Sequence, residues 1–271
     1  MAKKDDACKC KSENGWLPVN SRIQVNEDNS VNIQAPPGWE YIGITKKDSK
    51  VLRVASGGTS VSCLCNVSGK CLPFIGTGPG GGTSGCAGNC TNCTMKQSAV
   101  IDAKEIDFIR GGYIDFADSM RIIDDETNLP AAFDEMFELQ EVENEIQEFF
   151  KRIYCGMPYP EMKIGENYVA APRGFTMAPV SIFGRAAMVP VPTALLPESL
   201  KTRALAAGGG GSKASCSCTD GECTAATYNV PFVGSATYCK GSCDGTCTLT
   251  TSVGVGSGVE VELYKAISYN F

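Results

Sequence analysis

Hydrophobic and polar residues alternate near both ends of the chain, which predicts strands there. Residues 23–33 follow the two-residue period on both sides of a polar turn, as in a β-hairpin. Residues 51–54 alternate in the same way, and apolar residues at alternate positions in 253–263 predict a closing strand or hairpin. We therefore expect a β-rich amino-terminal segment, 1–62, and a carboxy-terminal strand or hairpin within 249–271.

The period changes to that of a helix between residues 130 and 154. Apolar side chains recur there every three or four residues, and Gly156 follows as a stop. Lys151 and Arg152 suit the carboxyl end of a helix, where cations interact favourably with its dipole. The pattern predicts one central amphipathic helix in a mainly helical segment, 95–156. Its apolar positions are Phe133, Met136, Phe137, Leu139, Val142, Ile146, Phe149, Phe150 and Ile153, and the carboxylates Glu135, Glu138, Glu141, Glu145 and Glu148 are expected to form its solvated face.

Prolines and apolar residues are interleaved in 157–207. Proline at this density disfavours long helices and interior strands, because it lacks the amide donor that both require. The apolar content is too high for a solvated linker, so the segment predicts an extended arm that lies against its own chain or a neighbouring subunit. A short helix is expected in 195–207, followed by a glycine-rich joint, 208–215. Together these elements predict an α+β fold with β-rich ends, a central helix and a proline-rich arm.

The net charge of -6 on 271 residues, without a basic cluster, argues against nucleic acid or an anionic membrane surface as the main partner. No apolar run reaches the roughly 18 residues of a membrane-spanning helix. The polar first residues do not resemble a secretory signal. We therefore expect synthesis in the cytoplasm without a signal peptide. A protein made in this way could still leave the cell as part of a released particle.

The chain contains no histidine, which excludes Ser-His-Asp and Cys-His nucleophile systems and His-ligated zinc or haem. A non-enzymatic protein is therefore expected. The chain does contain 15 cysteines, so its chemistry is expected to be that of sulfur.

The same arrangement of six cysteines occurs in residues 63–94 and again in 216–248. Each module opens with Cys-x-Cys, continues through a Pro-Phe-x-Gly block and closes with three more cysteines, although the spacing drifts by one residue in two places. The match predicts an internal repeat, with Cys8 and Cys10 as a partial third copy. Cys155 is left over, and a buried small residue is the preferred interpretation over a free or intermolecular thiol.

Three chemistries fit a six-cysteine module. Disulfides would staple a small domain with a thin core, thiolates could hold zinc or an iron–sulfur cluster, and a precursor peptide could carry modified cysteines. Metal sites are strict about spacing while disulfide-linked loops tolerate drift, so disulfides without a cofactor are favoured. If the modules are not bridged, the candidate metal ligands are Cys63, Cys65, Cys71, Cys86, Cys90, Cys93, Cys216, Cys218, Cys223, Cys239, Cys243 and Cys247.

These features predict a structural subunit of a larger assembly, such as a virion, a filament or a multiprotein complex. Its partners would be protein subunits reached by the proline-rich arm. The alternative is an intracellular metal-binding protein with zinc or iron–sulfur clusters in the modules, in an electron-transfer role. A modified precursor peptide is the second alternative.

Overall fold

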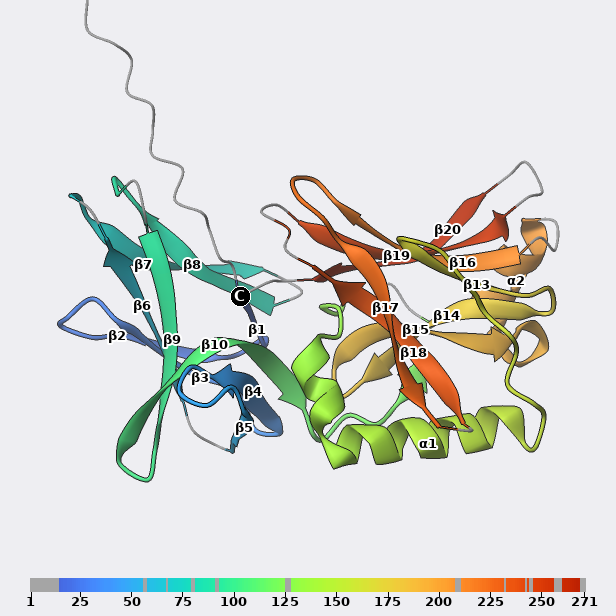
Figure 1. The fold of residues 1–271 in the computed structure, drawn as a ribbon, viewed down its shortest axis with the longest axis horizontal. Helices are drawn as coiled ribbons and strands as arrows, with labels where there is room; N and C mark the ends of the chain where they lie inside the picture. The colour runs from blue at the N-terminus through green and yellow to red at the C-terminus, as the bar shows by residue number, and fades with distance from the viewer. Residues whose placement is uncertain are drawn as a thin grey trace, which may run out of the picture. The chain divides into compact units, whose positions relative to one another are not determined.

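The structure is a computed structural model that describes residues 15–55, 58–66, 68–78, 81–90, 93–124, 128–207, 211–231, 233–241, 243, 246–255 and 260–268. Strands make up 57% of the described residues and helices 14%, and the strands form four antiparallel sheets. The chain divides into two compact units, one ending at Tyr113 and the other beginning at Ile114. The predicted α+β fold with a central helix and an extended arm is therefore wrong, and the described residues are β-rich (Figure 1).

Unit 1 consists of two sheets. The aromatic ring of Tyr41 packs edge-on against Phe108 and Tyr113, with ring centroids 5.1 and 5.3 Å apart, and all three side chains are buried. The three-stranded sheet has the order β1 (Gly15–Leu17), β8 (Gly81–Gly88), β7 (Cys71–Gly78). The seven-stranded sheet has the order β2 (Arg22–Val25), β3 (Val31–Gln34), β6 (Thr59–Cys65), β9 (Cys93–Ile101), β10 (Lys104–Asp115), β4 (Trp39–Thr45), β5 (Val51–Val54).

The predicted hairpin in residues 23–33 is confirmed. Strands β2 and β3 pair with Ile23 opposite Ile33, and the turn is closed by the amide of Asn26, which donates to the carbonyl oxygen of Ser30 at 2.9 Å. Asn29 adopts a positive φ of 63°, a conformation that asparagine tolerates better than most residues. The predicted strand in residues 51–54 is also present, as β5.

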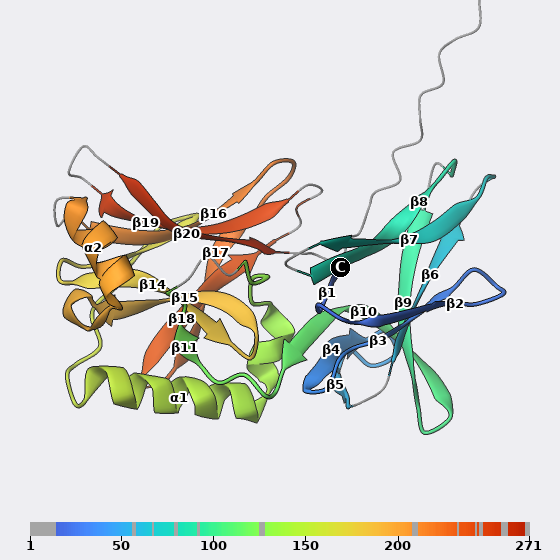
Figure 2. The same cartoon turned by 180° about the vertical axis from the view of Figure 1, so that it is seen from behind.

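Unit 2 contains the other two sheets and both α-helices of the described residues. One sheet has the order β11 (Arg121–Ile122), β14 (Phe175–Ile182), β15 (Arg185–Pro192), β18 (Gly234–Lys240), β17 (Thr224–Val230). The other has the order β12 (Lys163–Ile164), β13 (Tyr168–Ala171), β16 (Gly211–Cys218), β19 (Cys247–Val255), β20 (Val261–Ser268). Seen from either side, α1 (Gln140–Tyr154) runs along the β14–β15–β18 sheet, away from β16, β19 and β20 (Figures 1 and 2).

Helix α1 buries its apolar stripe, as its pattern predicts, against β18 and its neighbours. A Cβ on Gly234 would lie 2.9 Å from the ring of Phe150, so the absence of a side chain in β18 lets that ring approach. The predicted start of the helix is wrong, because residues 130–139 do not join it. Pro130 and Ala131 instead form parallel bridges with Ile267 and Ala186, and a short 3-10 helix (Asp134–Glu138) follows.

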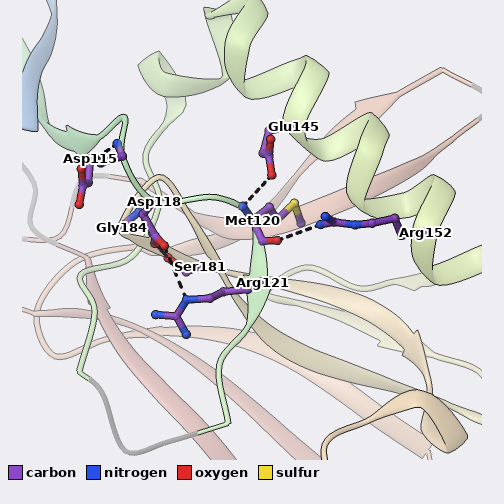
Figure 3. Close-up of polar contacts among 9 residues, drawn as sticks. Asp115, Asp118, Met120, Arg121, Glu145, Arg152, Ser181 and Gly184 are labelled. Carbon is purple, nitrogen blue, oxygen red and sulfur yellow. Dashed lines mark hydrogen bonds and ion pairs between the residues drawn. The ribbon is translucent and has the colours of Figure 1, made fainter. Parts of the chain in front are cut away.

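The carboxylates of this region are not all solvated. The side chain of Glu145 accepts a hydrogen bond from the amide of Met120 at 2.8 Å, and the guanidinium of Arg152 donates to the carbonyl oxygen of Met120 at 3.2 Å (Figure 3). Glu135, outside the helix, is buried. Two side chains of α1 thus bind the amide and the carbonyl group of Met120. Met120 is buried and lies in the segment that enters unit 2.

The predicted proline-rich arm folds into strands, and its central hairpin is buried. Strands β14 and β15 pair along their whole length and are almost entirely buried. Prolines fit there because the outer neighbours pair with this hairpin at few positions: β11 reaches only Ser181 and Val180, and β18 reaches only Met188. Pro179 and Pro190 therefore lie where little ladder pairing is lost.

Two smaller predictions fall in the same region. A short helix, α2 (Glu198–Ala206), lies within 195–207 as expected. Residues 211–215 of the predicted joint belong to strand β16. The described chain contains no helix long and apolar enough to cross a lipid bilayer.

Candidate functional site: the two cysteine modules

Each cysteine module is built from four consecutive strands shared between two sheets. In unit 1 the first and fourth strands, β6 and β9, pair in the seven-stranded sheet, and the second and third, β7 and β8, pair in the three-stranded sheet. In unit 2 the first and fourth strands are β16 and β19, and the second and third are β17 and β18. The two modules therefore have the same strand plan.

All twelve candidate cysteines lie in pairs at disulfide distance. The Cα atoms of the paired residues are 5.7 to 6.1 Å apart, within the range that a disulfide spans. In both modules the first cysteine pairs with the fourth, the second with the fifth and the third with the sixth. The pairs are Cys63 with Cys86, Cys65 with Cys90, Cys71 with Cys93, Cys216 with Cys239, Cys218 with Cys243, and Cys223 with Cys247.

Two of the three bridges in each module connect the two sheets of the unit, and the third joins the first strand to the connection after the third strand. The first two cysteines lie on the first strand and the sixth begins the fourth strand. The fourth cysteine lies on the third strand, the third cysteine begins or directly precedes the second strand, and the fifth lies two or three residues beyond the end of the third strand. The register places Cys65 opposite Cys93 and, in the other unit, Cys218 opposite Cys247. The bridges thus cluster at one end of the paired strands and fasten one layer to the other.

A glycine occupies the same critical place in both modules, two residues after the fourth cysteine. A Cβ on Gly88 would lie 2.0 Å from the carbonyl oxygen of Lys70, and one on Gly241 would lie 2.5 Å from that of Glu222. Lys70 and Glu222 each precede the third cysteine. The backbone approach that brings the second and third strands together at the bridges therefore requires glycine.

The modules differ in what surrounds their sulfurs. In unit 1 the cysteines form a small cluster of their own, with Met95 packed against it. In unit 2 the cysteines Cys216, Cys223, Cys239 and Cys247 are part of the main hydrophobic core, together with Met177 and Leu249. The Pro-Phe-x-Gly block also differs, since Pro73 lies in β7 opposite Cys86 whereas Pro231 follows the end of β17.

A cation beside each module is paired with carboxylates. Lys96 on β9 contacts Asp107 at 3.0 Å and Glu105 at 3.1 Å, and these contacts raise the pKa of Lys96. On β16, Lys213 contacts Glu260 at 2.9 Å. Hydrogen bonds from Ser252, which has the larger effect, and from Lys213 lower the pKa of Glu260.

The remaining cysteines divide into one described residue and two that lie outside. Cys155 is exposed and unbridged, at the end of α1, so its interpretation as a buried small residue is wrong. It adopts a left-handed conformation with φ 46°, and its amide donates to the carbonyl oxygen of Lys151 at 3.1 Å. The end of the helix thus places the side chain in solvent. Cys8 and Cys10, the predicted partial third copy, lie outside the described residues.

Several buried tyrosines are titratable groups with shifted pKa values. Burial raises the pKa of Tyr154 and of Tyr113 well above the ordinary value for a phenol. The hydroxyl of Tyr154 donates to the carbonyl oxygen of Pro190 at 2.6 Å, and that of Tyr159 lies 2.6 Å from the hydroxyl of Ser235. These contacts link α1 and the segment after it to the sheet, so the tyrosines serve in packing. No protein-family model, curated protein sequence or solved structure matched the chain.

Proposed function

We propose that this protein is a structural subunit of a larger protein assembly, in which each unit is a two-layered β-structure fastened by one cysteine module. The observation that carries the proposal is that two bridges in each unit join one sheet to the other. Bridges in that position limit the separation of the layers and suit a rigid building block. A redox catalyst instead needs an accessible, reactive cysteine, whereas Cys86, Cys90 and Cys239 are buried.

The equivalent strand plans and bridge orders also support the hypothesis of an internal repeat. Duplication would give one chain two fastened units of the same kind. An assembly subunit built in this way, in a virion, a filament or a protein complex, presents two rigid bodies to its neighbours.

Strand β2 supplies a surface through which such subunits can associate. Among the described strands it ends the seven-stranded sheet and pairs with β3 alone, and it is exposed along its whole length. Ile23 and Val25 lie opposite the buried residues Ile33 and Val31 and therefore point to the same face of the sheet. The apolar face of the sheet is buried at β3 and thus continues onto β2, where it is exposed.

The occupant that fits this edge is β2 of a second copy. Natural edge strands are usually protected by lysine or proline, and β2 contains neither; its one charge, Arg22, is at its end. Antiparallel pairing of two β2 strands about a two-fold axis would satisfy both free backbone edges and cover Ile23 and Val25.

Sedimentation velocity on the oxidised chain, over a range of concentrations, tests this proposal. We expect a dimer or larger species, and we expect the double variant Ile23→Lys and Val25→Lys to sediment as a monomer. The matched control is Val100→Lys with Ile109→Lys, because these residues are 68% and 54% exposed but lie on the inner strands β9 and β10. A wild-type chain that stays monomeric, or a control that dissociates equally, would contradict the role of β2.

A further inference from the structure

Two of the three bridges in each module lie side by side. The sulfurs of the first, third and fourth cysteines are all within 4.8 Å of one another, both for Cys63, Cys71 and Cys86 and for Cys216, Cys223 and Cys239. The third cysteine is bridged to the sixth, so Cys93 and Cys247 bring a fourth sulfur to each group. Each module therefore gathers four sulfurs at one place between its sheets.

Reduction of the bridges would leave four sulfurs close enough together to reach the spacing of a metal–thiolate site. Sulfur ligands lie about 2.3 Å from zinc, so two ligands of a tetrahedral site are about 3.8 Å apart. In each group of three the first and fourth sulfurs are bonded to each other, so they would move apart to this separation on reduction, while the third sulfur already lies within 4.8 Å of both. The bridge between the second and fifth cysteines does not belong to this group of three.

The surroundings of the sulfurs favour a soft cation. In unit 2 Cys216, Cys223 and Cys239 are all buried, so thiolates there would be shielded from water and would need a counter-charge. An all-sulfur donor set selects zinc and related soft ions over magnesium or calcium. The same three positions converge in both modules although the spacing between their cysteines differs, so the grouping follows from the shared strand plan.

We propose that, when its bridges are reduced, each module holds one soft divalent cation such as zinc on its first, third, fourth and sixth cysteines. Reduction of three bridges takes six electrons and six protons from three dithiol molecules and yields six thiols, while each dithiol is oxidised to its own disulfide. Four of the thiols then release four protons as their thiolates bind the ion. The modules would thereby keep their sheets joined in either redox state, by bridges when oxidised and by metal when reduced.

Cobalt(II) titration of the full chain, reduced with a water-soluble phosphine under anaerobic conditions, tests the inference. Two equivalents should bind with the sulfur-to-cobalt charge transfer and intense visible bands of a tetrahedral thiolate site. The double variant Cys63→Ser and Cys86→Ser should reduce this to one equivalent, with the unit 2 module as the internal reference. The matched double variant Cys65→Ser and Cys90→Ser, which also removes one bridge, should still bind two.

A second measurement needs no variant. In the zinc-loaded reduced chain, alkylation should spare the four proposed ligands of each module and label Cys65, Cys90, Cys218 and Cys243, as read by peptide mass. Absence of stoichiometric cobalt binding, or equal protection of all twelve cysteines, would overturn the inference. The oligomeric state of the oxidised chain is measured without metal, so a failure here is distinguishable from a failure of the proposed assembly function.

Discussion

Gly88 lies against the carbonyl group of Lys70, so closely that a Cβ at residue 88 would be 2.0 Å from the carbonyl oxygen. The same oxygen accepts a hydrogen bond from the amide of Asn89 at 3.0 Å, which fixes the carbonyl in place. This contact joins the end of β8 to the residue before Cys71, next to the bridges. Any side chain at position 88 would push these backbones apart.

Gly88→Ala should therefore destabilise unit 1 by about 1–3 kcal/mol, the usual cost of overpacking. Both tryptophans of the chain, Trp16 and Trp39, lie in unit 1, so tryptophan fluorescence during urea unfolding reports on that unit alone. Gly76→Ala is the control, since its Cβ would meet only the rotatable hydroxyl of Thr83, at 3.2 Å. Equal unfolding midpoints for the two variants would contradict the interpretation.

Loss of a bridge should cost more in unit 2 than in unit 1. Replacing Cys63 and Cys86 by alanine should lower the free energy of unfolding by about 2–4 kcal/mol, chiefly because the unfolded chain gains conformational entropy without the bridge. The equivalent change at Cys216 and Cys239 also leaves a cavity, because both side chains belong to the main core of unit 2. Urea unfolding, followed by fluorescence for unit 1 and far-ultraviolet circular dichroism for both units, measures the difference. Equal losses would show that packing around the sulfurs does not matter.

Two glutamates of α1 that are three residues apart should respond very differently to alanine. Glu145→Ala removes the acceptor of the buried amide of Met120 and should cost about 1.5–3 kcal/mol. Glu148→Ala removes only an exposed ion pair with Lys151 and should cost less than about 1 kcal/mol. Circular dichroism during urea unfolding gives both values, and a cost at Glu148 as large as that at Glu145 would refute the anchoring role.

Unit 2 should lose stability at alkaline pH. Burial raises the pKa of Tyr154 in the folded chain, while the unfolded phenol ionises near pH 10.0. The unfolded state therefore binds fewer protons above that pH, so the stabilisation is complete below about pH 10 and falls as the pH rises further. Tyr154→Phe should flatten this decline, at a cost of about 0.5–1.5 kcal/mol near neutral pH from the lost hydrogen bond to Pro190. Identical pH profiles of unfolding midpoints for variant and wild type would count against Tyr154.

Local patterns predicted the elements that local interactions decide. The hairpin of β2 and β3 follows from alternation around a polar turn, and the apolar stripe of α1 from its helical period. Local patterns gave wrong predictions where a segment pairs with residues that are distant in the sequence. Pro130 and Ala131 pair with β20 and β15 rather than extending the helix, and the prolines of 157–207 are accommodated because few neighbouring strands need their amides.

The module cysteines were evident from the sequence, but their pairing was not. Six cysteines allow 15 pairings, and spacing alone does not choose among them. The choice follows from the strand plan, since the register sets Cys65 opposite Cys93, and their partners lie just after β8 and at the start of β7. Cys155 was misjudged because burial of a cysteine depends on where its helix ends relative to the core.

The interleaved order of the bridges has a consequence for damage to the chain. Between Cys63 and Cys93 every peptide bond is spanned by at least one bridge, since the pairs join residues 63 to 86, 65 to 90 and 71 to 93. The same holds between Cys216 and Cys247. A protease that cuts once within either module therefore leaves a single covalent molecule, whose two pieces separate only after reduction.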